Sequence, residues 1–206
     1  MKKVLLVILA FAFLIACKSE KSPEQKHLEF EGISIAGNGD AFIKELERRG
    51  FEYREEYIFL SSQTYTIPPH YKGRFLGVDD CEVDPVFTNS GTLWRVAVDM
   101  PREENKDTAE ARFNRYYYHL VQLFGEPLPE KASAYSDRHL DWELEQGKIA
   151  LVLDSNKAYT SIEVDGKPLF EPEYRVYCWY DDAEGESVFN QEKQEERIDN
   201  MKKGIH

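Results

Sequence analysis

The chain has 206 residues, 31% of them charged, and a formal net charge of −12 at pH 7. This acidic balance disfavours nucleic acid as a partner, because nucleic-acid binding requires a basic patch that displaces counterions from the phosphates. It also disfavours adsorption to anionic lipid, and keeping the protein in solution is the simplest role for the charge. The length suits one large domain or two small ones.

The N-terminus has the pattern of an export signal. Two lysines at positions 2 and 3 precede an unbroken apolar run of 13 residues, Val4–Ala16. A helix that spans a bilayer needs about 20 apolar residues, whereas the apolar region of a secretory signal peptide has this length and these flanks. The run ends in L-I-A-C, with the cysteine at position 17. This ending resembles the lipobox of bacterial lipoproteins, in which the cysteine receives diacylglycerol and signal peptidase II cleaves just before it.

The resemblance implies that residues 1–16 are removed and that Cys17 becomes the lipidated N-terminus. Palmitate and the other acyl chains would then attach the protein to a membrane, because two or more chains give a stable anchor. Lys18 follows the cysteine, and the resemblance then points to the outer membrane of the cell envelope, on either its periplasmic or its surface side. Residues 18–26 contain no aliphatic or aromatic side chain, so residues 17–27 are predicted to be a flexible tether.

The folded part is expected to begin with a short strand region, Leu28–Ile35, that turns at Gly32. A helix then starts near Asp40, carries its apolar residues on one face and ends at Gly50. A strand is predicted from Phe51 through Tyr65. Two further strands, 74–87 and 93–100, are separated by the turn residues 88–91, and strict alternation in the second marks a half-buried strand.

The second half repeats this order. A longer helix, beginning near Asp107 or Thr108, carries an apolar stripe up to Phe124 and is followed by Gly125 and Pro127. Strands are predicted at 140–145, 148–154, 159–164 and 174–180. Residues 183–206 are highly charged and favour a C-terminal helix or tail.

This order predicts an α+β fold. We expect two α-β-β-β-like units, residues 28–104 and 105–182, within one region from 28 to 182, with helices packed on antiparallel sheet and a C-terminal helical tail. Consecutive strands without crossover helices favour this class over a parallel sheet.

One segment resembles a known family. The opening F-x-G-I-x-I-x-G at 30–37, followed by Phe42, Leu46 and Gly50-Phe51, is similar to small uncharacterised lipoproteins of Bacteroidota. In these proteins a "GIPIxG…F…L…GF" segment starts an α/β repeat, and Ser34 stands here where the family usually has proline. The resemblance brings no known activity. The layout is also similar to the helices-on-sheet modules of periplasmic inhibitor and outer-membrane-assembly lipoproteins, which is an analogy of architecture alone.

Two cysteines remain after Cys17. In an oxidising envelope Cys81 and Cys178 can form a disulfide. Both lie in predicted strands, so the alternative is two buried thiols on separate strands.

The pattern contains no recognisable catalytic or metal site. The five histidines lack zinc-site spacing, and no G-x-S-x-G motif is present; the histidines are His27, His70, His119, His139 and His206. The acidic cluster around Cys81 is either a calcium site or a solvated strand face, and the solvated face is the favoured interpretation; it comprises Asp79, Asp80, Glu82 and Asp84. We therefore predict no catalytic residue, no metal ligand and no cofactor.

Four aromatic residues are candidates for recognition of a sugar, peptide or protein: Trp94, Tyr118, Trp142 and Trp179. Exposed aromatic rings offer large contact area at low entropic cost. For any single one of them, packing in the core is the more common outcome. Arg95 and Arg175, beside Trp94 and Val176, are either contacts at the rim of such a surface or ordinary solvent-facing strand positions.

Three functions are compatible with these observations. The leading hypothesis is a membrane-anchored, non-catalytic binding or assembly module with a protein or glycan partner. The second is a module that inhibits an enzyme, and the third is a small carboxylate-dependent envelope hydrolase. An exposed aromatic patch favours the first two. A deep pocket with two carboxyls at glycosidase spacing, one of them with a strongly raised pKa, favours the third.

Overall fold

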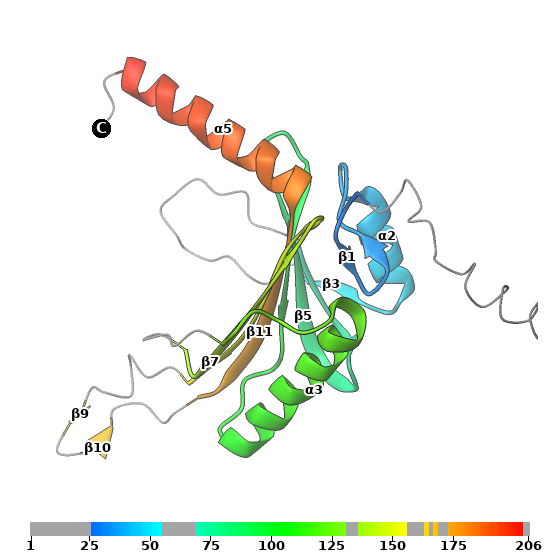
Figure 1. The fold of residues 1–206 in the computed structure, drawn as a ribbon, viewed down its shortest axis with the longest axis vertical. Coiled ribbons are helices and arrows are strands. Elements are labelled where there is room, and N and C mark those ends of the chain that lie inside the picture. Colours follow the sequence, from blue (N-terminus) through cyan, green and yellow to red (C-terminus); the bar gives the residue numbers. More distant parts are fainter. Residues whose placement is uncertain are drawn as a thin grey trace, which may run out of the picture.

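The computed structural model describes residues 26–54, 69–130, 136–155, 163–164, 167–168 and 173–203 (Figure 1). The predicted signal peptide, Cys17 and most of the predicted tether lie outside this range. The part of the strand predicted from Phe51 through Tyr65 that follows Arg54 also lies outside it. Among the helices of the described residues, none is long and apolar enough to cross a membrane.

A seven-stranded antiparallel sheet forms the centre of the molecule, in the order β3-β4-β5-β6-β11-β8-β7. Its strands are β3 (Glu52–Arg54), β4 (His70–Phe75), β5 (Val78–Phe87), β6 (Leu93–Asp99), β7 (Arg138–Leu144), β8 (Gly147–Asp154) and β11 (Arg175–Asp182). Two small antiparallel pairs accompany it, β1 (Glu29–Phe30) with β2 (Ile33–Ser34) and β9 (Glu163–Val164) with β10 (Lys167–Pro168).

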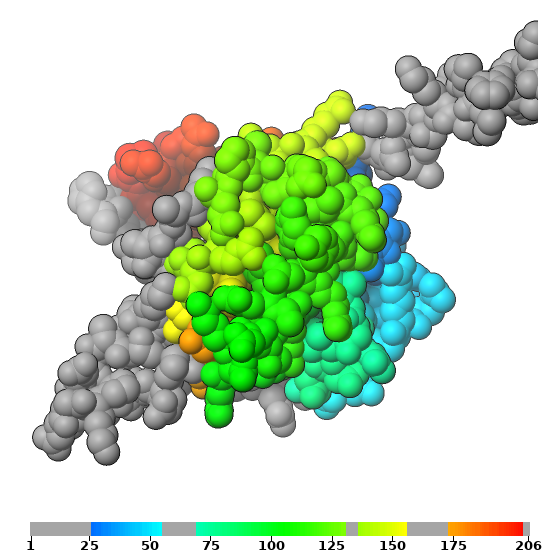
Figure 2. All heavy atoms as spheres, turned by 60° about the horizontal axis from the view of Figure 1, so that its bottom comes forward, coloured from blue at the N-terminus to red at the C-terminus, as the bar shows by residue number. Residues whose placement is uncertain are grey.

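Helices α2 (Asp40–Arg48) and α3 (Lys106–Phe124) lie on the same face of the sheet, whereas α5 (Ala183–Lys202) projects from one end of it (Figure 1). The space-filling view shows the green residues of α3 lying across the surface, with the cyan end of the α2 region beside them (Figure 2). The predicted α+β class, the antiparallel sheet and the C-terminal helix are confirmed.

The two halves of the chain contribute the two halves of the sheet. Helix α2 is followed by β3 to β6, and α3 is followed by β7, β8 and β11. The last strand of each half, β6 and β11, pair at the centre, with Val98 opposite Cys178. The repeated order of a helix and then antiparallel strands is therefore present, and both halves bury their apolar residues in a single core.

One predicted strand is wrong. The continuous strand expected over 74–87 is divided by a tight turn at Leu76 and Gly77, which joins β4 to β5. Both turn residues have positive φ, 47° and 77°, as in the type I′ turns that match the twist of a hairpin. Leucine rarely adopts this conformation, so the sequence pattern gives little indication of the turn. The strands predicted at 140–145, 148–154 and 174–180 correspond to β7, β8 and β11.

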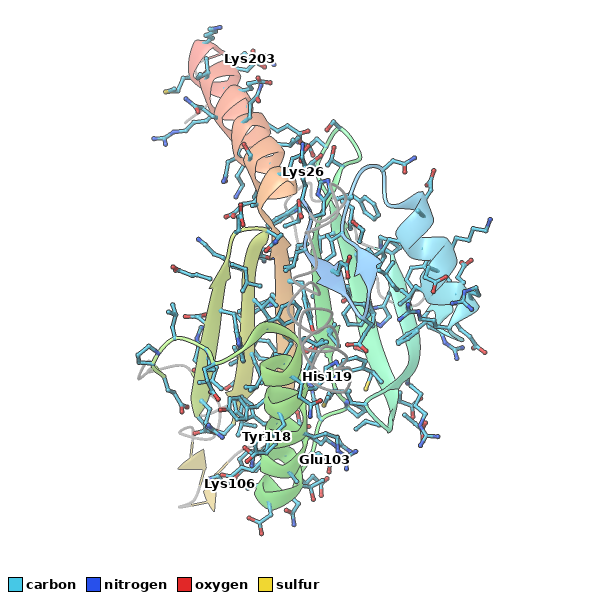
Figure 3. All side chains as sticks on the ribbon, turned by 45° about the vertical axis from the view of Figure 1, so that its right-hand side comes forward. Lys26, Glu103, Lys106, Tyr118, His119 and Lys203 are labelled. Atoms are coloured by element: carbon cyan, nitrogen blue, oxygen red, sulfur yellow. The ribbon has the colours of Figure 1, made fainter. Side chains whose placement is uncertain are left out.

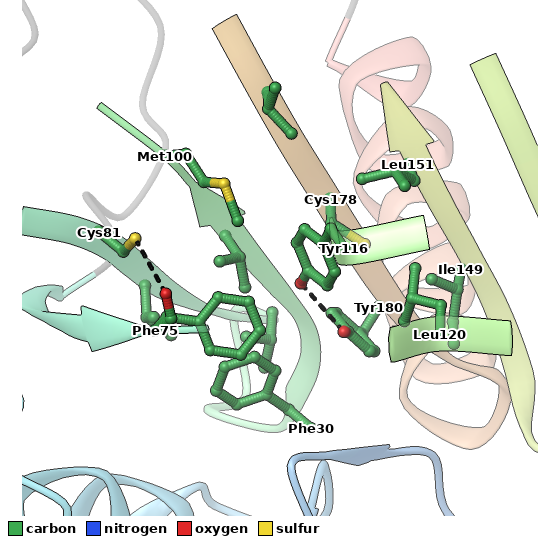
Figure 4. Close-up of a cluster of buried hydrophobic side chains, with 14 of the residues drawn as sticks. Phe30, Phe75, Cys81, Met100, Tyr116, Leu120, Ile149, Leu151, Cys178 and Tyr180 are labelled. Atoms are coloured by element: carbon green, nitrogen blue, oxygen red, sulfur yellow. Dashed lines mark hydrogen bonds between the residues drawn. The ribbon is translucent and has the colours of Figure 1, made fainter. Parts of the chain in front are cut away.

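The core lies between the sheet and the helices α2 and α3. Phe30 meets Tyr180 edge-on with ring centroids 5.4 Å apart, and Phe75 meets Tyr116 at 5.0 Å (Figure 4). The hydroxyl groups of Tyr116 and Tyr180 are fully buried and hydrogen-bond to each other at 3.0 Å. This bond matters because a buried hydroxyl without a partner would be strongly destabilising.

Candidate binding surface

The face of the sheet opposite α2 and α3 carries mostly polar and aromatic side chains. Side chains alternate along a strand, and Val96, Val98, Cys178 and Tyr180 point into the core. Their neighbours therefore point the other way, and three cross-strand pairs of this kind join β6 to β11: Arg95 with Asp181, Ala97 with Trp179 and Asp99 with Tyr177. We call this side of the sheet the polar face; it includes His70, Glu82, Asp84, Arg95, Ala97, Asp99, Ala150, Arg175, Tyr177, Trp179 and Asp181, together with Val152, which lies opposite Tyr177 and is buried.

Two arginines on the polar face form bidentate ion pairs with aspartates of the neighbouring strand. Nε and Nη2 of Arg95 donate to the two carboxylate oxygens of Asp181 at 2.5 and 2.7 Å. Arg175 donates in the same way to Asp99 at 2.7 and 2.6 Å. Paired hydrogen bonds of this type fix the plane of the guanidinium group and neutralise the charges locally.

Trp179 and Tyr177 form an aromatic patch between these ion pairs. Their ring centroids are 4.9 Å apart, and both residues are partly exposed. The guanidinium carbon of Arg95 lies 5.8 Å from the centre of the Trp179 ring, and that of Arg175 lies 5.2 Å from the Tyr177 ring. Alanines stand opposite Trp179 on both neighbouring strands, at positions 97 and 150. The indole ring of Trp179 therefore has no large cross-strand neighbour on these two strands.

A second group of polar side chains lies on β4 and β5. Nδ1 of His70 lies 2.5 Å from Oδ1 of Asp84, and Nε2 of His70 lies 3.5 Å from Oε1 of Glu82. Burial is the main cause that raises the pKa of Asp84 to about 6; His70 opposes the shift, and the carboxylates of Asp99 and Glu82 contribute to it. The contact with His70 fixes the position of the Asp84 carboxyl group. Within the part of the chain that the structure describes, no group of three or more His, Cys, Asp or Glu residues is arranged to hold a metal ion.

The raised pKa makes a testable prediction about stability. An acid whose pKa rises from 3.8 to about 6 on folding binds its proton more tightly in the folded state, so the domain loses stability as the pH rises through this window. We expect Asp84→Asn, which keeps an acceptor for His70, to be more stable than wild type by about 3 kcal/mol at pH 7.5 and by less than about 1 kcal/mol near pH 4. Urea unfolding at both values measures this difference.

The control is Asp79→Asn, which removes an exposed carboxylate of the same strand that lies 3.4 Å from Arg74. This variant should follow the pH dependence of wild type. A constant difference between wild type and Asp84→Asn at both pH values would contradict the assignment.

The structure separates the four predicted recognition aromatics. Trp142 is 2% exposed, and its indole Nε1 donates to the carbonyl of Gly125 at 2.8 Å. Trp94 is 7% exposed and stacks on Phe189 of α5, with centroids 4.3 Å apart. These two residues pack in the protein interior, so the expectation that they contact a ligand is not met. Tyr118 is 64% exposed on α3, on the opposite side of the sheet from Trp179.

Cys81 and Cys178 are free, buried thiols, so the disulfide considered from the sequence is not formed. Strand β6 lies between their strands, which separates the two backbones by about 9.5 Å, beyond the roughly 7 Å that a disulfide can bridge. Burial raises the pKa of Cys81 to about 11 and that of Cys178 further still. Neither thiol has the thiolate character that nucleophilic catalysis needs.

Comparison with known proteins gives no relative: no protein-family model matches the chain, and no curated protein or solved structure shows significant similarity to it.

Proposed function

We propose that this chain is a lipid-anchored protein of the bacterial cell envelope that acts as a non-catalytic binding module. Support for the anchor comes from the sequence, in which a basic start and a 13-residue apolar run lead into L-I-A-C. The lipid on Cys17 would hold the domain at a membrane, and the outer membrane is the proposed location because Lys18 follows the cysteine.

One observation supports the binding role: on the polar face, two partly exposed aromatic rings lie between two bidentate arginine–aspartate ion pairs. The aromatic rings offer apolar contact area, and the paired side chains keep lone pairs and N–H groups for further hydrogen bonds. A ligand that is uncharged and rich in hydroxyl groups, such as a glycan, can use both. A charged protein partner would gain less, because the arginine and aspartate charges already compensate each other.

The polar face would also serve an enzyme-inhibiting module, the second hypothesis from the sequence. Its ligand would then be a protein and not a glycan. The third hypothesis, a carboxylate-dependent hydrolase, is favoured by a single feature, the pKa of about 6 at Asp84. A general acid in glycoside hydrolysis has a raised pKa of this kind. The Nδ1 atom of His70, 2.5 Å from Asp84, would compete with a substrate oxygen for this carboxyl group.

Binding of the purified full chain to a microarray of neutral oligosaccharides tests the proposal. We expect Trp179→Ala to weaken binding about tenfold, which corresponds to roughly 1.4 kcal/mol from one aromatic contact. Tyr118→Ala is the matched control, since it removes an exposed aromatic side chain from the other side of the molecule and should leave binding unchanged. Binding that is insensitive to Trp179, or cross-linking of the polar face to an envelope protein without any glycan binding, would overturn the glycan proposal.

A further inference from the structure

The chain enters the domain at the point where α5 begins. The backbone N–H of Leu28 donates to Asp182 at 2.9 Å, and the backbone N–H of Gly185 in the first turn of α5 donates to the same carboxylate at 3.0 Å. Nδ1 of His27 lies 3.2 Å from it as well. Figure 3 shows Lys26 beside the base of α5 and Lys203 at its far end. Residues 26–28 and the first turn of α5 therefore lie at the same end of the sheet.

Among the described residues, the side chains that join α5 to the sheet come from the first half of the helix. Phe189 stacks on Trp94, and the carboxylate of Glu192 accepts from the backbone N–H groups of Asn89 and Ser90 in the turn between β5 and β6. From Lys193 to Asp199 every residue is exposed, and the helix extends away from the domain (Figure 1). Its 20 residues give a length of about 30 Å.

We propose that the far end of α5 rests on the lipid headgroups of the membrane that holds the protein. This inference depends on the proposed anchoring through Cys17. Cys17 precedes His27 by ten positions, so the lipid can lie at most about 35 Å from the base of α5. That reach slightly exceeds the length of the helix. The body of the domain lies on the other side of this base (Figure 3), so the end that carries both α5 and residues 26–28 is the end that faces the bilayer.

The tip of α5 has the chemistry of a weak interfacial contact. Ile198 and Met201 are 40% and 55% exposed, and a spacing of three residues places them on one side of the helix. Lys202 and Lys203 follow directly, and Nζ of Lys203 pairs with Asp199 at 2.5 Å. Long lysine side chains can reach phosphate groups while apolar neighbours enter the interface, and Lys203 would exchange Asp199 for a phosphate there. The contact is too small to hold a free protein on a membrane, but a tether raises the effective concentration to the millimolar range, so the anchored protein can populate it.

The test uses the lipidated full chain in vesicles of phosphatidylethanolamine and phosphatidylglycerol. A fluorophore is attached at Met201→Cys and, as the matched control, at Tyr118→Cys, because Tyr118 is also more than half exposed but lies on α3. The two native thiols in the domain are buried and should not react. With a quencher on the lipid headgroups, we expect at least twofold stronger quenching at position 201 than at 118, and a smaller difference when Lys202→Glu and Lys203→Glu are combined.

Vesicle flotation separates the two proposals. Protein that floats with the vesicles but shows equal quenching at positions 201 and 118 would overturn the contact of α5 while leaving the anchor intact. Protein that does not float would overturn both.

Discussion

Replacing Asp182 by alanine is expected to lower the free energy of unfolding by about 4 kcal/mol. The Asp182 side chain is fully buried and accepts hydrogen bonds from the backbone N–H groups of Leu28 and Gly185. Its loss leaves these two buried donors without their partner, each costing about 1–3 kcal/mol, and the bond from Gly185 is also the N-cap of α5. Urea unfolding followed by circular dichroism measures the change.

The control for Asp182→Ala is Glu184→Ala. Glu184 is highly exposed and lies 3.7 Å from Nε2 of His27, so its removal should change stability by less than about 0.5 kcal/mol. Asp182→Asn should fall between the two, because an amide oxygen can still accept one of the backbone hydrogen bonds. Equal stability of the Asp182 and Glu184 variants would show that the carboxylate does not join residues 27–28 to α5.

Replacing Gly185 by alanine is expected to cost about 3 kcal/mol. A Cβ atom at this position would lie 2.6 Å from the Cα of Trp94 and 2.8 Å from the carbonyl oxygen of Leu93. Both are backbone atoms of β6, so the clash can be relieved only by moving α5 away from the strand. That movement would also loosen the stacking of Phe189 on Trp94. Thermal unfolding and the near-ultraviolet signal of the tryptophans report the two effects.

Ser187→Ala, in the same turn of α5 but exposed, is the control for Gly185→Ala and should be close to neutral. If Gly185→Ala were as stable as Ser187→Ala, the close approach of α5 to β6 would be contradicted.

The parts of the fold that follow from local pattern could be predicted. Alternation along 93–100 identified β6, and the apolar stripe before Gly125 identified α3. The charged residues after 183 were compatible with a helix, which the structure confirms as α5. In each case the signal lies within one element, so knowledge of its partners was unnecessary.

The parts that depend on pairing between distant residues could not be predicted. Trp142 and Trp179 both occupy alternating strand positions, and only the register shows that Trp142 faces the core and Trp179 the polar face. The contact between Leu28 and Asp182 joins residues 154 positions apart. In the sequence, Asp182 stands among Asp181, Glu184 and Glu186, a pattern that favours surface charge, so nothing in it indicated a buried aspartate.

The candidate surface was foreseen only in part. Trp179 was among the aromatics selected from the sequence, but its neighbour Tyr177 was not, although a spacing of two residues places both on one side of β11. The ion pairs that surround them join β6 to β11. Recognising these pairs from the sequence would have required the alignment of two strands that lie about 80 residues apart along the chain.

The lipid on Cys17 is the central claim, because the envelope location and the contact of α5 both depend on it. Labelling bacteria that express the protein with radioactive palmitate, in wild type and in Cys17→Ala, tests it directly. We predict that the label is incorporated into wild type and lost from Cys17→Ala, with the unlabelled variant retaining its signal peptide. Equal label in both proteins, or none in wild type, would contradict the account.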